Sequence, residues 1–125
     1  MKQIFLMLLI GSLLSCRPNG NYLAINNNDL YFTPAVDKEF IGKVSEYLVS
    51  TEFFAQGGKS VQLDVVNSMP VFRLVIKASV AKDSSTKETA VAFGRIIQKD
   101  LYDKKPYILH LCDKHFNTLR AFKFN

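Results

Sequence analysis

The feature that most constrains the fold is an alternation of strand patterns with two amphipathic helical patterns across residues 29–125. Short runs of alternating apolar and polar residues are typical of half-buried strands, and two longer stretches repeat their apolar residues at helical spacing. Helices are predicted over 40–51 and from 83–86 to 101, and strands near 30–32, 61–65, 72–76, 107–111 and 119–124. The predicted order is β-α-β-β-α-β, followed by one more strand.

This order predicts an α+β fold. We expect a two-layer sandwich of the ferredoxin-like type, with the helices on one face of the sheet and an additional C-terminal strand. Asp37 is a predicted N-cap of the first helix, and Ser85 and Glu88 have the spacing of a capping box at the second. Gly94 lies beside the apolar stripe of the second helix, at a cost of up to about 1 kcal/mol relative to Ala unless close packing requires it.

The first sixteen residues, MKQIFLMLLIGSLLSC, have a different character. Lys2 precedes an apolar run from Ile4 to Leu14. This run is shorter than the roughly 20 residues that a membrane-spanning helix needs, but a basic residue followed by a short apolar run is typical of a signal peptide. Residues 1–15 are therefore predicted to be removed on export.

The end of this run, Leu13-Leu14-Ser15-Cys16, resembles the lipobox of bacterial lipoprotein precursors. Ser15 matches the small residue before the cleaved bond, and Cys16 matches the modified position, where a thiol can form a thioether with a lipid. Leu14 is bulkier than the usual residue at its position. The resemblance implies a membrane anchor on Cys16. The alternatives are an ordinary secreted protein with a chance cysteine and a short uncleaved anchor.

The segment that follows the cysteine is rich in Asn and contains Pro18 and Gly20. We expect residues 16–28 to form the lipidated cysteine and a flexible tether, and residues 29–125 to form a single domain. Because Arg17 rather than Asp follows Cys16, the lipoprotein resemblance implies the outer membrane in preference to the inner one. We expect the domain to face the periplasm of the cell envelope.

Three strings of the predicted domain, KSVQLDVV, VFRLVIK and HLCDKHFNTLR, resemble a small bacterial domain family with no assigned activity. The resemblance covers residues 29–125. It implies no catalytic residues and no cofactor.

The residues best suited to metal binding or redox chemistry are His110, Cys112 and His115. In a strand, His110 and Cys112 would point to one face, and with His115 they would offer soft ligands for zinc or copper. Cys112 could instead be a redox thiol if His110 lowered its pKa. The alternative is a surface histidine beside a structural cysteine. These three residues therefore define a metal or redox hypothesis.

The charge distribution argues against nucleic acid as a partner. The net charge is +5, but the basic residues are scattered among acids, and the densest pair is Lys104-Lys105. Export would also separate the protein from nucleic acid. Since no convergent catalytic set is apparent, we predict a non-enzymatic accessory module. Its open sheet face or its last strand, near 119–124, would bind a periplasmic protein.

Overall fold

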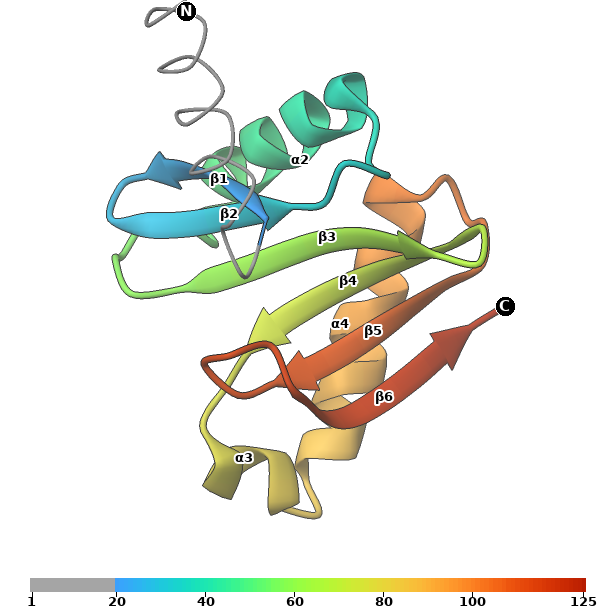
Figure 1. Cartoon of the computed structure of the whole chain (residues 1–125). Helices are drawn as coiled ribbons and strands as arrows, with labels where there is room; N and C mark the ends of the chain where they lie inside the picture. The colour runs from blue at the N-terminus through green and yellow to red at the C-terminus, as the bar shows by residue number, and fades with distance from the viewer. Residues whose placement is uncertain (1–19) are drawn as a thin grey trace, which may run out of the picture.

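The computed structural model describes residues 20–125, which form one six-stranded sheet and three helices (Figure 1). The predicted signal peptide and Cys16 lie outside the described residues. The strands are β1 (Asn21–Ile25), β2 (Asn28–Phe32), β3 (Ser60–Val66), β4 (Met69–Val75), β5 (Tyr107–Cys112) and β6 (Thr118–Phe124). The helices are α2 (Lys38–Ser50), α3 (Ala78–Lys82) and α4 (Thr86–Leu101).

The strands lie side by side in chain order, from β1 to β6. β2 is parallel to β3, and β4 is parallel to β5, with helices as the connections, while the other neighbouring pairs are antiparallel. The α+β class is confirmed, but the ferredoxin-like order is not. In a ferredoxin-like sheet another strand separates the two strands of each β-α-β unit, whereas here the two strands of each unit pair directly.

The sheet begins earlier in the chain than the sequence predicted. β1 lies within the segment expected to be a tether, and it pairs with β2 through a two-residue turn. The turn residues Asn26 and Asn27 have φ angles of 52° and 62°, a left-handed conformation that Asn tolerates better than most residues. The domain therefore starts before residue 29, because the Asn-rich run builds a hairpin turn rather than a flexible linker.

Asn28 fixes this hairpin to the rest of the domain. Its buried side-chain amide donates hydrogen bonds to the carbonyls of Ile25, Asn26 and Phe54, each at 3.0 Å. Its Oδ1 accepts a hydrogen bond from the Lys59 N–H at 2.9 Å. Both polar atoms of this buried amide are hydrogen-bonded, so the side chain links the hairpin to the segments of Phe54 and Lys59 in one specific arrangement.

The helices begin where the sequence predicted, but the predicted capping hydrogen bonds are not formed. α2 follows Asp37 and α4 follows Ser85, yet neither side chain makes a capping hydrogen bond. Ser85 already has helical angles of −71° and −18°, and an N-cap residue normally has an extended backbone. Asp83 acts in its place by accepting hydrogen bonds from the N–H and the hydroxyl of Ser85.

The core lies between the helices and one face of the sheet. α4 crosses behind β4, β5 and β6 in Figure 1, and α2 lies beside β1 and β2. Residues of both helices and of five strands share one buried cluster: Leu30, Ile41, Val44, Leu48, Phe54, Val61, Leu63, Phe72, Ala90, Ile97, Leu101, Tyr102, Tyr107, Leu109, Leu111 and Phe124. All of these residues lie between 30 and 124, so the described body carries a core of its own.

Candidate functional site

The sheet face opposite the core, which we call the open face, carries two of the residues singled out from the sequence. The strand register aligns Tyr31, Gln62, Arg73 and His110 in one row across β2, β3, β4 and β5. Paired residues of neighbouring strands point to the same face. Side chains remote in the sequence therefore meet there.

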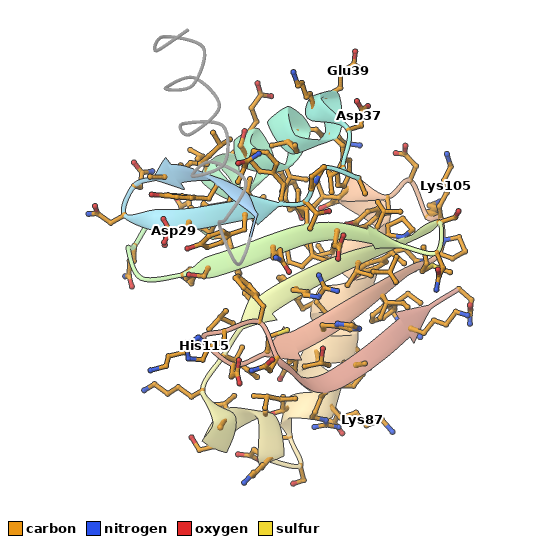
Figure 2. All side chains as sticks on the ribbon, in the orientation of Figure 1. Asp29, Asp37, Glu39, Lys87, Lys105 and His115 are labelled. Atoms are coloured by element: carbon orange, nitrogen blue, oxygen red, sulfur yellow. The ribbon has the colours of Figure 1, made fainter. Side chains whose placement is uncertain are left out.

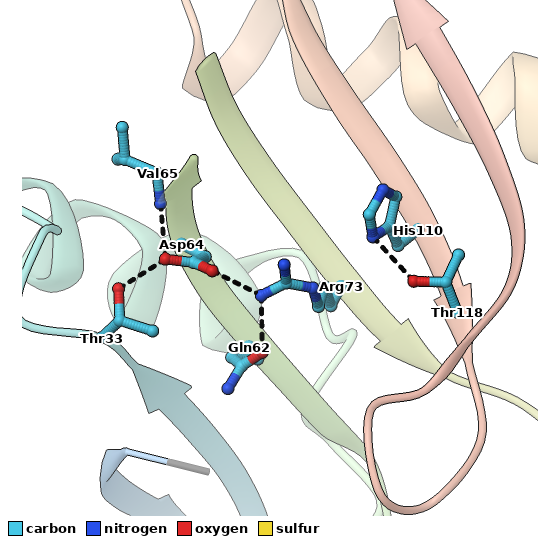
Figure 3. Close-up of polar contacts among 7 residues, drawn as sticks. All are labelled: Thr33, Gln62, Asp64, Val65, Arg73, His110 and Thr118. Atoms are coloured by element: carbon cyan, nitrogen blue, oxygen red, sulfur yellow. Dashed lines mark hydrogen bonds and ion pairs between the residues drawn. The ribbon is translucent and has the colours of Figure 1, made fainter. Parts of the chain in front are cut away.

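Arg73 is the centre of a polar cluster on the open face (Figure 3). Its Nη1 donates to Asp64 Oδ2 at 2.7 Å and to Gln62 Oε1 at 2.8 Å. Asp64 Oδ1 also accepts from the Thr33 hydroxyl at 2.7 Å and from the Val65 N–H at 2.8 Å. The Arg73 and Asp64 side chains are each 16% exposed, so this ion pair is largely shielded from water.

The cluster sets the protonation of its members. Burial alone would raise the pKa of Asp64, but the hydrogen bonds from Thr33, Arg73 and the Val65 N–H outweigh it, and the net pKa is lowered. The pKa of His110 is also lowered, first by burial and then by the positive charge of Arg73, against an opposing effect of Asp64. At neutral pH the site therefore contains a carboxylate, a guanidinium and an uncharged imidazole.

The structure keeps two residues of the metal or redox hypothesis on one face of β5 and places the third in a turn. His110 and Cys112 share the open face, and His110 Nδ1 lies 3.1 Å from the Thr118 hydroxyl. His115 is exposed in the turn between β5 and β6 (Figure 2). Within residues 20–125, no group of three or more His, Cys, Asp or Glu side chains is arranged to hold a metal ion.

Cys112 is fully buried, and burial raises the pKa of its thiol to about 11. Arg73 and Thr118 lower this pKa by smaller amounts. The thiol is therefore protonated at neutral pH, and a protonated buried thiol is a poor nucleophile and metal ligand.

Sequence reasoning did not single out an aromatic group on the open face. Tyr31 lies 5.3 Å from the ring of Tyr22 and 5.4 Å, edge to face, from the ring of Phe116. Phe116 belongs to the turn between β5 and β6 and has a φ of 61°. Asp113 holds this turn, because its Oδ1 accepts hydrogen bonds from two backbone N–H groups, those of His115 and Asn117. The turn thus fixes an aromatic ring against the ring of Tyr31.

A second candidate site lies on the core side, between α3, the start of α4 and the sheet. It is a half-open cavity of about 340 Å³. Leu74, Ile76 and Leu111 form its floor, and Phe53 and Phe93 form a wall. Such a size and an apolar lining are typical of small-molecule sites. No sequence motif marked it, because its lining comes from five separate segments.

Across residues 20–125, no helix combines the length and the apolar character needed to cross a membrane. Comparisons with protein-family models, with characterised proteins and with solved structures found no match.

Proposed function

We propose that this chain is a bacterial lipoprotein, anchored by lipid on Cys16 to the cell membrane or the outer membrane, whose domain is a non-enzymatic protein-interaction module facing the periplasm. The observation that carries the proposal is the leader MKQIFLMLLIGSLLSC, in which a lipobox-like Leu-Leu-Ser-Cys ends a short apolar run. A diacylated cysteine holds a protein stably at a bilayer without any membrane-spanning helix.

The distance along the chain from Cys16 to the domain is short. The backbone of Gly20 already lies against the end of β2, where an added Cβ would come within 2.7 Å of the Phe32 carbonyl oxygen. Only residues 17–19 separate Gly20 from Cys16, and four residue steps span at most about 14 Å. A lipid on Cys16 would therefore hold the β1 side of the domain close to the bilayer, with β6 at the opposite edge of the sheet.

The chemistry of the open face supports binding rather than catalysis. The thiol of Cys112 is buried and protonated, and the charges of Asp64 and Arg73 satisfy each other. The exposed members of this face include the ring of Tyr22 and the small side chain of Ala121 on β6. A face that combines aromatic rings with satisfied polar groups, beside a free edge strand, suits contact with another protein.

Mass spectrometry of the chain purified from bacterial membranes tests the anchor. We expect the mature protein to begin at Cys16 and to carry the mass of a diacylglyceryl group. Cys16→Ser should remove the lipid and release the domain from the membrane fraction, whereas Cys112→Ser, the matched control, should change neither result. An unmodified Cys16, or a retained leader, would refute the lipoprotein assignment.

Site-specific photo-crosslinking in intact cells tests the interaction surface. A crosslinking amino acid at Ala121, on the open face at the β6 edge, should give one discrete adduct with an envelope protein. The same amino acid at Ala92, on the exposed side of α4, is the control and should give none. Equal adducts at both positions, or none at Ala121 in the lipidated protein, would count against a specific partner on this face.

A further inference from the structure

We propose that the cavity between α3, α4 and the sheet is a binding site for a small amphiphile with one aliphatic chain and a cationic amine head. This site lies on the opposite side of the sheet from the proposed partner surface. The inference does not depend on lipidation of Cys16.

The cavity exists because the two ends of α4 differ in side-chain size. Near its C-terminal end, α4 packs Ile97 and Leu101 into the core. Near its start, three residues of α4 that line the cavity, Thr86, Thr89 and Ala90, have smaller side chains. These small side chains leave a half-open space beside the sheet that an added apolar group can occupy.

The walls of the cavity suit a hydrocarbon chain. Leu74 near the end of β4, Ile76 directly after this strand and Leu111 from β5 form an aliphatic floor. Phe53 and Phe93 are stacked with 5.7 Å between ring centroids and an interplanar angle of 28°, and they close one side. Such a surface offers no directional polar partner, so its affinity would grow with the apolar area of the ligand that it buries.

The polar groups at the mouth select the head group. Among the described residues that line the cavity, Asp83 is the one with a charge, and it lies beside the hydroxyls of Ser85, Thr86 and Thr89. Hydrogen bonds from the Ser85 N–H and hydroxyl lower the pKa of Asp83, so it is ionised at neutral pH. The Thr86 hydroxyl is engaged by the Val80 carbonyl. The mouth therefore complements a positive head group and disfavours a fatty-acid carboxylate.

Titration calorimetry of residues 20–125 with hexyl-, octyl- and decylamine, below their micelle concentrations, tests the site. We expect one site and about fourfold tighter binding for each added methylene until the cavity is full. Decanol should bind more weakly than decylamine, and decanoate should bind most weakly. Absence of saturable decylamine binding, or decanoate binding as tight as decylamine binding, would overturn the proposal.

Two pairs of variants locate the ligand. Ala90→Leu fills the cavity and should weaken decylamine binding at least about tenfold, the loss of two or more methylene contacts, whereas Ala92→Leu on the exposed face of the same helix should leave it unchanged. Asp83→Asn should weaken the amine but not decanol, and Glu88→Gln is its control. If Ala90→Leu fails to fold, Thr89→Leu at the exposed mouth replaces it. Equal affinities within either pair would place the ligand elsewhere and refute the site.

Discussion

Gly94 offers the sharpest test of how the α4 side of the core is packed. It lies in the third turn of α4, and an added Cβ would overlap the ring of Phe124, at the end of β6. That ring cannot easily move, because it is buried and stacks on Tyr107 with 5.2 Å between centroids and an interplanar angle of 13°. The Tyr107 hydroxyl in turn donates a 2.6 Å hydrogen bond to the Gly94 carbonyl. Only a residue without a Cβ fits at position 94 beside the Phe124 ring.

Two opposing effects set the magnitude for Gly94→Ala. Ala is favoured over Gly within a helix by about 1 kcal/mol, whereas forcing a methyl group into a filled core costs about 1–3 kcal/mol. We expect a net loss of about 1 kcal/mol in the free energy of unfolding. Gly42→Ala is the matched control, because Gly42 lies within α2 and has no atom within 4 Å of an added Cβ. It should raise the free energy of unfolding by about 0.5–1 kcal/mol.

Urea unfolding of residues 20–125, followed by circular dichroism, measures both values. The double variant Gly94→Ala with Phe124→Leu should lose less stability than the sum of the two single variants, because the smaller side chain makes room for the methyl group. If Gly94→Ala stabilised the domain as much as Gly42→Ala does, the close contact between α4 and β6 would be refuted.

Three further predictions concern acid stability, thiol reactivity and a turn. The lowered pKa of Asp64 gives stability that is present above about pH 4, the unfolded value, and is lost as the pH falls through the folded value. In urea unfolding between pH 2 and 7, Asp64→Asn should be less stable than wild type at pH 7, and the difference should shrink as the pH falls below about 4. A difference that stayed constant over this range would contradict the lowered pKa. The Cys112 thiol, with a pKa of about 11, should resist iodoacetamide at pH 8 in the native body and react only after unfolding, and rapid native labelling would contradict its burial. Ser68 has a φ of 66° in the two-residue turn between β3 and β4, so Ser68→Gly should stabilise by up to about 1 kcal/mol in the same urea assay, and a lower midpoint would argue against this turn.

The elements that the sequence predicted are those with a strong local pattern. Alternation in β3, β4 and β5 and the apolar stripes of α2 and α4 follow directly from which side chains must be buried. Strand β1 was not predicted, because its turn, Asn26-Asn27, lies in an Asn-rich run that is also typical of a linker. The better signal was the pairing of two short apolar runs, Tyr-Leu-Ala-Ile and Leu-Tyr-Phe, across that turn.

The order of strands in the sheet was beyond the reach of local patterns. A β-α-β succession permits a parallel pair that is adjacent or split by another strand, and both arrangements bury the same apolar faces. The pairing of Leu30 with Val61 and of Phe72 with Leu109 depends on how six strands fit together. No single segment encodes that choice.

The two candidate sites were hidden for different physical reasons. On the open face, the ion pair between Asp64 and Arg73 follows only from the register of β3 against β4, which neither strand encodes alone. In the cavity, the signal is a deficit of volume, because the buried Ala90 falls where a filled core would place a larger side chain. The helical pattern marks Ala90 as an apolar position, but it does not tell whether the side chain is large enough to fill the space beside the sheet. The cavity can be recognised only once the fold places Leu74 and Leu111 opposite Ala90. The Ala90→Leu variant tests whether this unfilled volume is where the ligand binds.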